Sequence, residues 1–186
     1  FVGEAGPAPA DHSFSLYQDR ATAMKQPEAI AKRYVLYFNE SLRGLSVGAP
    51  VTLLGLTMGE VASVGWDLAP GTSVLRGRAE IVAFPERLVA LLDPAQAATG
   101  EAILSTPRKR HALVERLVEG QGLRGQLRSG NLLTGQLYVA LDFFPDAPMA
   151  KVDWSQDMPE VPTVESTLPD LEAKLSSIMA KIDQIP

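Results

Sequence analysis

Four short runs of β-branched, aromatic and aliphatic residues follow one another in the first half of the chain, with glycine or proline between them. The runs cover residues 33–38, 51–54, 60–64 and 76–84. Residues of these types favour strands, and the glycines and prolines that separate them favour turns. Because the turns are too short for crossover helices, we expect mostly antiparallel pairing, in a small sandwich or barrel.

A single helix is predicted to interrupt the strands. Thr106 and Pro107 have the pattern of a helix cap followed by proline in the first turn, and Gly120 is a typical helix end. Between these signals, one apolar stripe is formed by Ala112, Leu113 and Leu117.

Two more strands are expected at residues 123–128 and 136–144, because apolar and polar residues alternate in both. Their connection, residues 129–135, holds Leu132 and Leu133, although hairpin tips are normally polar. In one interpretation the two leucines begin the second strand and one of them enters the core. In the other, both project from the barrel into an apolar space shared by neighbouring subunits, since water would be an unfavourable surrounding for them.

The two ends of the chain differ in composition from the middle. Residues 1–32 contain three prolines and are expected to connect a preceding domain to the barrel of residues 33–145. Residues 146–165 are again rich in proline, which predicts an extended spacer that contributes little to a sheet.

Residues 166–186 carry an apolar side chain at every third or fourth position. These positions are Leu168, Leu171, Leu175, Ile178, Ile182 and Ile185. The spacing is that of a heptad seam, and an isolated helix of about 18 residues is only marginally stable in water. We therefore expect the seam to pair with another copy of the chain, and the alternative is that it folds back onto its own domain.

Composition narrows the functional class only slightly. The 186 residues allow one domain with appendages, and a net charge of −5 with 21% charged residues lacks the positive excess of nucleic-acid-binding proteins. There is no cysteine, which excludes disulfides and thiol catalysis. No stretch reaches the roughly 18 consecutive apolar residues of a membrane-spanning helix. The chain begins at Phe1 without a leader, so we expect a piece of a longer protein whose anchor lies elsewhere.

One short motif suggests catalysis. Residues 44–48 match the G-x-S-x-G pattern of a hydrolase, with Ser46 as nucleophile and Asp93 and His111 following in the order of a triad. That motif requires a strand before the serine and a helix after it, whereas here we expect a turn and then a strand. A serine hydrolase is therefore kept only as a remote alternative.

No cluster of residues predicts a metal or phosphate site. His12 and His111 have no second histidine or carboxylate at a ligand spacing. The only basic run, residues 108–110, has no aromatic residue between its charges and is typical of a solvated helix face.

A longer set of motifs resembles a known family. Residues 34–64 read YVLYFNESLRGLSVGAPVTLLGLTMGEVASV, which contains an F-x-x-S-x-x-G-L-x-x-G-x-x-V segment followed by G-x-x-x-G-x-V. The repeated positions are held by Gly44, Leu45, Gly48, Val51, Gly55, Gly59 and Val61. This segment resembles the MCE (mammalian cell entry) family. Residues 14–17, 128–148 and 163–183 resemble its paraquat-inducible protein B (PqiB) branch in particular.

The resemblance implies a mainly β fold, a small seven-stranded MCE β-barrel with one inserted helix and a C-terminal heptad helix. It implies a homohexameric ring in the periplasm of a Gram-negative bacterium, anchored to the inner membrane by a segment outside this chain. Such rings move lipid between the inner and outer membranes. Residues 166–186 would begin a needle-forming coiled coil, and the partners would include other MCE domains of the same chain and an inner-membrane protein.

The family's pore-lining loop falls on the leucine hairpin. The resemblance therefore implies that Leu132 and Leu133 line a hydrophobic pore, with Asn131 and Thr134 beside them, for phospholipid or other hydrophobic cargo. It implies no catalytic residue, cofactor, metal or nucleic acid. The rival function is a monomeric β-barrel that binds a ligand or acts as an adaptor, with its C-terminal helix folded back.

Overall fold

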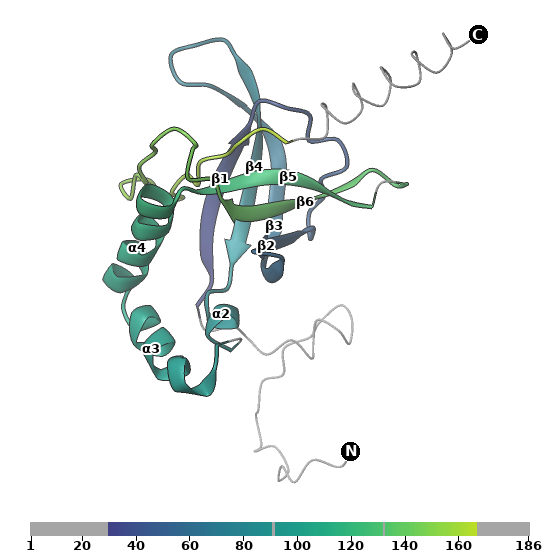
Figure 1. Cartoon of the computed structure of the whole chain (residues 1–186). Helices are drawn as coiled ribbons and strands as arrows, with labels where there is room; N and C mark the ends of the chain where they lie inside the picture. Colours follow the sequence, from purple (N-terminus) through teal and green to yellow (C-terminus); the bar gives the residue numbers. More distant parts are fainter. Residues whose placement is uncertain (1–29, 91, 132, 167–186) are drawn as a thin grey trace, which may run out of the picture.

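The computed structural model describes residues 30–90, 92–131 and 133–166. In this part of the chain six strands form one curled sheet, in the order β1-β4-β3-β2-β6-β5 (Figure 1). The strands are β1 (Lys32–Phe38), β2 (Pro50–Leu53), β3 (Leu56–Leu68), β4 (Leu75–Ala83), β5 (Leu123–Asn131) and β6 (Gln136–Phe143). The mainly β fold predicted from the sequence is confirmed, and each expected strand is present.

The pairing is antiparallel throughout, except between β2 and β6. In that parallel pair Val51 lies opposite Val139, and Leu53 lies opposite Leu141. A parallel pair requires a long connection, and here β3, β4, the helices and β5 all lie between the two strands in the chain. All other strand pairs are antiparallel, so the expectation of mostly antiparallel pairing is confirmed.

Residues 159–164 lie between the two edge strands and hydrogen bond to both. Val35 of β1 donates its N–H to the carbonyl of Pro159 at 3.1 Å, and Gly125 of β5 donates to the carbonyl of Pro162 at 2.9 Å. Each edge strand also forms one parallel bridge with this segment. The described residues thus hold six strands and a bridging segment where the resemblance implies seven strands, and the proline-rich residues contribute more to the sheet than expected.

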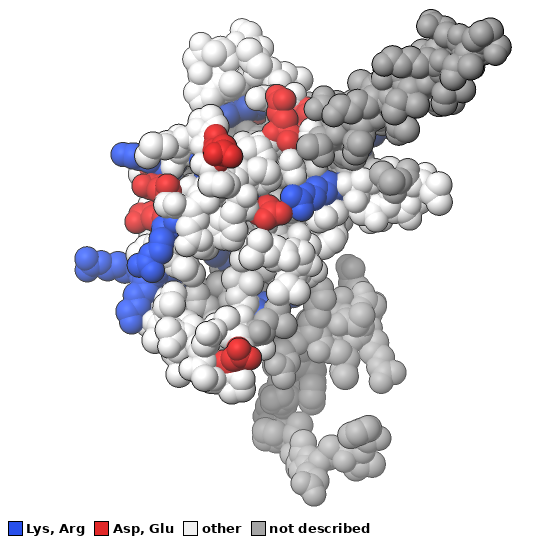
Figure 2. Space-filling model, viewed as in Figure 1, with Lys and Arg blue, Asp and Glu red and all other residues white. Residues whose placement is uncertain are grey.

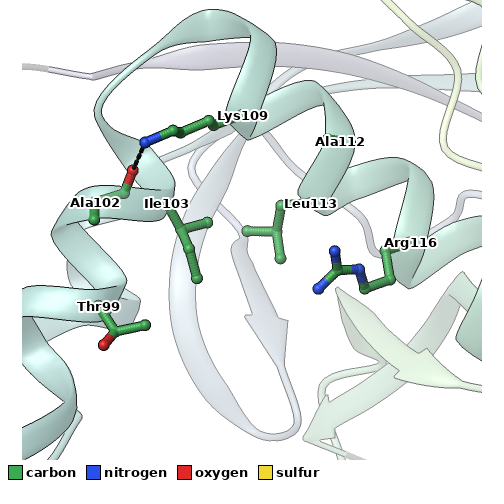
Figure 3. A pocket seen from close by; sticks show the side chains of 7 residues that line it. All are labelled: Thr99, Ala102, Ile103, Lys109, Ala112, Leu113 and Arg116. Carbon is green, nitrogen blue, oxygen red and sulfur yellow. Dashed lines mark hydrogen bonds between the residues drawn. The ribbon is translucent and has the colours of Figure 1, made fainter.

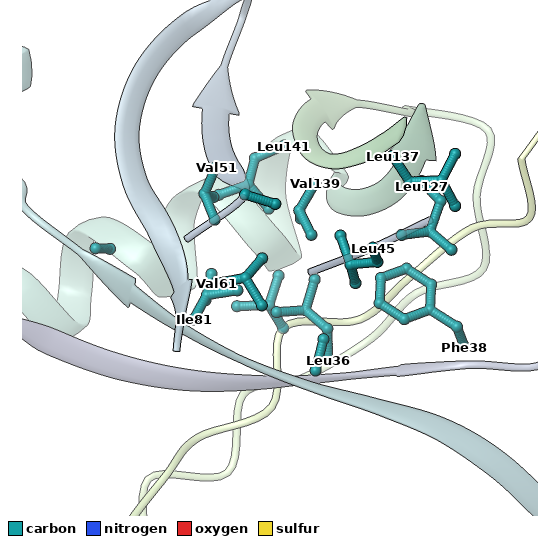
Figure 4. Packing of buried hydrophobic residues seen from close by; sticks show 14 of the residues in the cluster. Leu36, Phe38, Leu45, Val51, Val61, Ile81, Leu127, Leu137, Val139 and Leu141 are labelled. Carbon is teal, nitrogen blue, oxygen red and sulfur yellow. The ribbon is translucent and has the colours of Figure 1, made fainter. Parts of the chain in front are cut away.

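The core lies inside the curl of the sheet (Figure 4). Inward positions alternate along the strands, as in β4, where every second residue from Gly77 to Ala83 is buried. The largest fully buried side chains include Phe38, Leu36, Ile81, Leu127, Val51, Val61 and Val139. Each such side chain stabilises the fold by about 1.5–3 kcal/mol relative to its exposure to water. Leu42 and Leu45, from the loop after β1, join the same cluster.

Three helices and a π-helical turn, rather than one helix, connect β4 to β5. They are α2 (Glu86–Ala90), α3 (Pro94–Leu104), α4 (Pro107–Glu115) and η1 (Arg116–Gly120). The predicted helix is α4, whose cap Thr106 accepts the N–H of Lys109 at 3.3 Å. Helix α3 was not predicted, because its apolar residues gather on no single face, although Pro94 stands in its first turn.

Two hairpins project from the sheet on the sides away from the helices (Figure 1). One is the end of β5 and β6. The other is the end of β3 and β4, which continue beyond the last residue of β1. Figure 2 shows no charged side chain on the visible face of either outer part.

Several predicted features lie outside the described residues. They are most of the 1–32 connector with the 14–17 cluster and His12, the side chain of Leu132, and the whole seam of Leu168, Leu171, Leu175, Ile178, Ile182 and Ile185. Within the described ranges, no helix has the length and apolar character needed to cross a membrane.

Candidate functional site

The tip of the β5–β6 hairpin is built around the side chain of Asn131. Its amide oxygen accepts the N–H of Leu133 at 2.9 Å and that of Thr134 at 3.3 Å. The backbone carbonyl of the same residue accepts the N–H of Gly135 at 3.0 Å. Gly135 has φ +67°, a conformation that glycine adopts without strain. These bonds pair the N–H groups of residues 133–135 within the turn itself.

Leu133 points away from the rest of the described chain, because 97% of its surface is exposed. Strand β6 begins three residues later, at Gln136. The interpretation in which both leucines begin the strand is therefore wrong for Leu133, which also does not enter the core, while Leu132 lies outside the described residues. Asn131 and Thr134 are also exposed, so the three described residues of the predicted pore-lining set lie together at one tip.

The root of the hairpin is fixed to the barrel. Leu127 and Val139 lie opposite each other and are fully buried, and Leu137 is 8% exposed. On the other face, Arg128 forms an ion pair with Asp142 at 2.9 Å. No residue between 129 and 137 is charged. The hairpin therefore has an apolar root in the core, one ion pair where it leaves the barrel, and an uncharged outer part.

The loop after β1 supports the hairpin directly. The carbonyl of Gly44 accepts the N–H of Leu137 at 2.9 Å. Gly44 has φ +96°, and a Cβ atom at this position would collide with the carbonyl oxygen of Gly135. A motif glycine is thus required by a close approach of two backbones, and this approach sets the position from which the tip projects.

The structure does not form the hydrolase motif. Ser46 lies in an exposed turn, its carbonyl accepts the N–H of Ala49 at 3.1 Å, and the chain then enters strand β2 rather than a helix. Asp93 precedes the first residue of α3 as its cap. The strand, serine and helix that a nucleophile elbow needs are not found around Ser46.

His111 serves a packing role instead. Its ring stacks on Trp154 with 3.8 Å between the ring centroids and 11° between the planes. The indole Nε1 of Trp154 donates to a carboxylate oxygen of Glu115 at 2.8 Å. These contacts fasten the segment after β6 to α4. The sequence analysis missed this contact, and an isolated tryptophan in a proline-rich segment is the signal that could have found it.

A shallow hollow of about 270 Å³ lies between α3 and α4 (Figure 3). Ile103 and Leu113 form its apolar wall, with Lys109 at the rim. The ammonium group of Lys109 donates to the carbonyl of Ala102 at 3.0 Å, at the end of α3. This cation is therefore occupied in joining the two helices. Within the described ranges, no group of three or more histidine, aspartate or glutamate side chains could hold a metal ion.

Comparison with known proteins identifies the family. Residues 31–144 match the MlaD protein family. Among solved structures, the Acinetobacter MlaFEDB complex in its ATP-bound Vtrans1 conformation contains a similar chain with 17% sequence identity. That match covers 78% of this chain and 81% of the other, with a TM-score of 0.40. Because the family match spans the whole sheet and the helices between β4 and β5, this chain belongs to the MlaD family of MCE domains.

Proposed function

We propose that this protein is a subunit of a channel that carries lipids between the inner and outer membranes of a Gram-negative cell. Six copies form a ring in the periplasm, and the β5–β6 tips of all copies meet at its axis. Leu132 and Leu133, flanked by Asn131 and Thr134, line a hydrophobic pore there. The chain performs no bond-making step and provides an apolar path.

One observation carries this proposal, the 97% exposure of Leu133 at the end of an uncharged projecting hairpin. A leucine in this position does not stabilise the described fold, and exposure to water is unfavourable. Six such tips around one axis would bury one another's leucines and exclude water. A lipid acyl chain loses about 0.8 kcal/mol for each methylene group exposed to water, so a continuous apolar lumen lowers the barrier to its passage.

The finer identity follows the PqiB-like motifs of the sequence. In a PqiB-like protein this chain would be the last MCE domain, preceded by other MCE domains and an inner-membrane anchor. Residues 166–186 begin a needle of helices whose seam faces neighbouring helices or the lumen. An inner-membrane protein is the expected partner, and loss of transport would weaken the outer membrane.

The test uses the full-length protein with Leu132→Asn and Leu133→Asn. We expect a folded ring that no longer carries co-purified lipid and no longer restores the outer membrane of a deletion strain. The matched control is Val47→Ser with Leu54→Asn, which removes two apolar side chains of 67% and 61% exposure elsewhere on the barrel. A double-leucine variant with unchanged lipid content and transport would overturn the proposal.

A second experiment addresses the geometry. The chain has no cysteine, so Leu133→Cys introduces a single thiol. Oxidation of the intact assembly should join subunits through residue 133, because the tips meet at the axis. If the protein is instead a monomeric module, no disulfide between chains should form at the protein concentrations at which its function is assayed. Absence of crosslinking in an assembly that transports lipid would also contradict the proposed pore.

A further inference from the structure

The β3–β4 hairpin forms a second projection, which we name the β3–β4 arm and define as residues 66–76. The last pair between β1 and β4 joins Phe38 to Gly77. Beyond that pair only β3 and β4 continue, so the arm is a two-stranded ribbon that leaves the barrel (Figure 1). Residues 66–76 pair only within the β3–β4 hairpin, so the rest of the sheet does not depend on them.

Beyond the Asp67–Arg76 pair, the arm carries apolar side chains on both faces. Leu68 and Leu75 lie directly opposite each other, so they share one face with Trp66, and 58–64% of the surface of each is exposed. Val74 lies just before β4, and its carbonyl accepts the N–H of Ala69, which extends the ladder by one pair. It therefore lies on the face opposite Leu75, and it is 58% exposed. More than half of the surface of each of these four side chains is exposed in the described part of the chain. A surface that docks one protein partner would need only one apolar face.

The arm carries no net charge. Residues 68–75 contain no charged side chain. The nearest charges are Asp67 and Arg76, which neutralise each other through an ion pair of 2.7 Å, and the guanidinium of Arg76 lies 3.4 Å from the ring centroid of Tyr37. This group of contacts fixes the polar base of the arm against β1. In Figure 2 the visible part beyond that base has no charge.

The turn at the end of the arm pairs three of its own N–H groups. The N–H of Ala69 donates to the carbonyl of Val74 at 2.9 Å, and the N–H of Thr72 donates to the carbonyl of Ala69 at 3.0 Å. The hydroxyl of Thr72 accepts the N–H of Val74 at 3.2 Å. An unpaired backbone group in an apolar medium costs several kcal/mol. These bonds therefore lower the number of backbone groups at the tip that depend on water.

We propose that the β3–β4 arm inserts into the interfacial layer of a lipid bilayer. Apolar side chains on both faces of its outer part, an uncharged tip and a turn with three internally bonded N–H groups fit a medium that surrounds the tip on all sides. Trp66, near the base, is of the residue type that prefers the boundary between acyl chains and headgroups. This membrane contact is separate from the pore and does not depend on the finer PqiB-like arrangement of other domains and a needle.

A second copy of the chain fits the arm less well. Its exposed apolar side chains offer roughly 400 Å² of surface, about half of what each partner of a stable protein pair buries. They are also divided between two faces, so one flat partner surface would cover only part of them. A lipid layer covers both faces at once.

Fluorescence of Trp66 can test the insertion. The chain has two tryptophans, and Trp154→Phe leaves Trp66 as the only one while a ring remains beside His111. With vesicles of phosphatidylcholine, we expect the Trp66 emission to shift to shorter wavelength and to be quenched by brominated acyl chains. Because the arm is uncharged, binding should be the same in 0.1 M and 0.5 M salt.

Variants in the same background provide the comparison. Leu68→Ser with Leu75→Ser should lower vesicle partitioning at least tenfold and leave the thermal midpoint of unfolding nearly unchanged. Val47→Ser with Leu54→Asn, two equally exposed positions outside the arm, should partition as the parent does. Three results would overturn the proposal. They are retained binding in the arm variant, binding only to anionic vesicles at low salt, and self-association through the arm without vesicle binding.

Discussion

The backbone carbonyl of Gly44 accepts the N–H of Leu137 at 2.9 Å, and this bond ties the loop after β1 to the root of the β5–β6 hairpin. The two residues are distant in the chain, and the approach leaves no room for a side chain at Gly44. A motif glycine is thus a positioning residue for the proposed pore-lining tip.

Gly44→Ala tests this relationship. The new Cβ atom would meet the carbonyl of Gly135, and φ +96° is unfavourable for alanine, so we expect the free energy of unfolding to fall by about 2–4 kcal/mol. Denaturant unfolding measures this change. Gly48→Ala is the matched control, because Gly48 has φ +81° but no atom within 4 Å of the added Cβ. It should cost only about 1–2 kcal/mol, and equal losses in the two variants would show that the close approach contributes nothing.

The strands could be predicted from the sequence because their signals are local. Alternation of apolar residues and the glycines of the turns depend on neighbours in the chain, and both were sufficient to locate all six strands. The start of β6 was ambiguous because Leu132 and Leu133 are as apolar as strand residues. The hydrogen bonds to the side-chain oxygen of Asn131 and the positive φ of Gly135 place the turn before the strand. Neither feature can be derived from hydrophobicity.

The contribution of residues 159–164 could not be predicted for a different reason. Proline lacks a backbone N–H and is usually excluded from sheets. Here Pro159 and Pro162 act only as acceptors, and the N–H groups of Val161 and Val164 donate to the edge strands at 2.9 Å. The two prolines stand at positions where only a carbonyl acceptor is required, so their lack of an N–H group costs no hydrogen bond. This arrangement depends on which strands lie at the edges, which is a property of the complete fold.

Leu54 occupies a strained turn between β2 and β3. It has φ +50° and is the only described residue other than glycine with a positive φ, followed by Gly55 at +83°. Asparagine is much better tolerated at such a position, so Leu54→Asn should raise the free energy of unfolding by about 1 kcal/mol. Leu56→Asn removes a similarly exposed leucine from regular strand and should give no gain. A decrease in stability for Leu54→Asn would mean that this leucine makes a contact that the described chain does not contain.

Arg124 is a buried cation without a carboxylate partner among the described residues. Its guanidinium donates to the carbonyls of Val118 at 3.0 Å and Leu123 at 2.8 Å, and also to that of Pro148. Burial lowers the pKa of Arg124 from its ordinary value. The side chain thus joins η1, β5 and the segment after β6.

Arg124→Met should lower the free energy of unfolding by about 2–3 kcal/mol, because it leaves buried carbonyl groups without donors. Chemical denaturation provides the measurement. Arg33→Met is the control, since Arg33 is 62% exposed and lies 3.7 Å from Glu80. An exposed pair of this kind contributes at most about 1 kcal/mol. If both variants lost the same small amount, the three carbonyl contacts of Arg124 would not be stabilising.

Tyr34 connects the stability of the barrel to alkaline pH. Burial raises the pKa of Tyr34 to about 12, although the positive charge of Arg110 acts in the opposite direction. In the unfolded chain the phenol has a pKa of about 10. A proton is therefore held more tightly in the folded state, so the stabilising contribution is complete below pH 10 and is lost as the pH rises from 10 to 12.

We expect the free energy of unfolding to fall by up to about 2–3 kcal/mol across this range because of Tyr34 alone. Urea unfolding at pH 9 and pH 11.5 would measure the fall. In Tyr34→Phe the ring remains but cannot ionise, so the difference between the two pH values should shrink by most of that amount. The control is Tyr138→Phe, which removes a tyrosine on the outer side of β6. In this variant the free energy of unfolding should still fall between pH 9 and pH 11.5 as it does in the parent. If the two variants respond identically, burial of the Tyr34 hydroxyl does not account for the alkaline loss of stability.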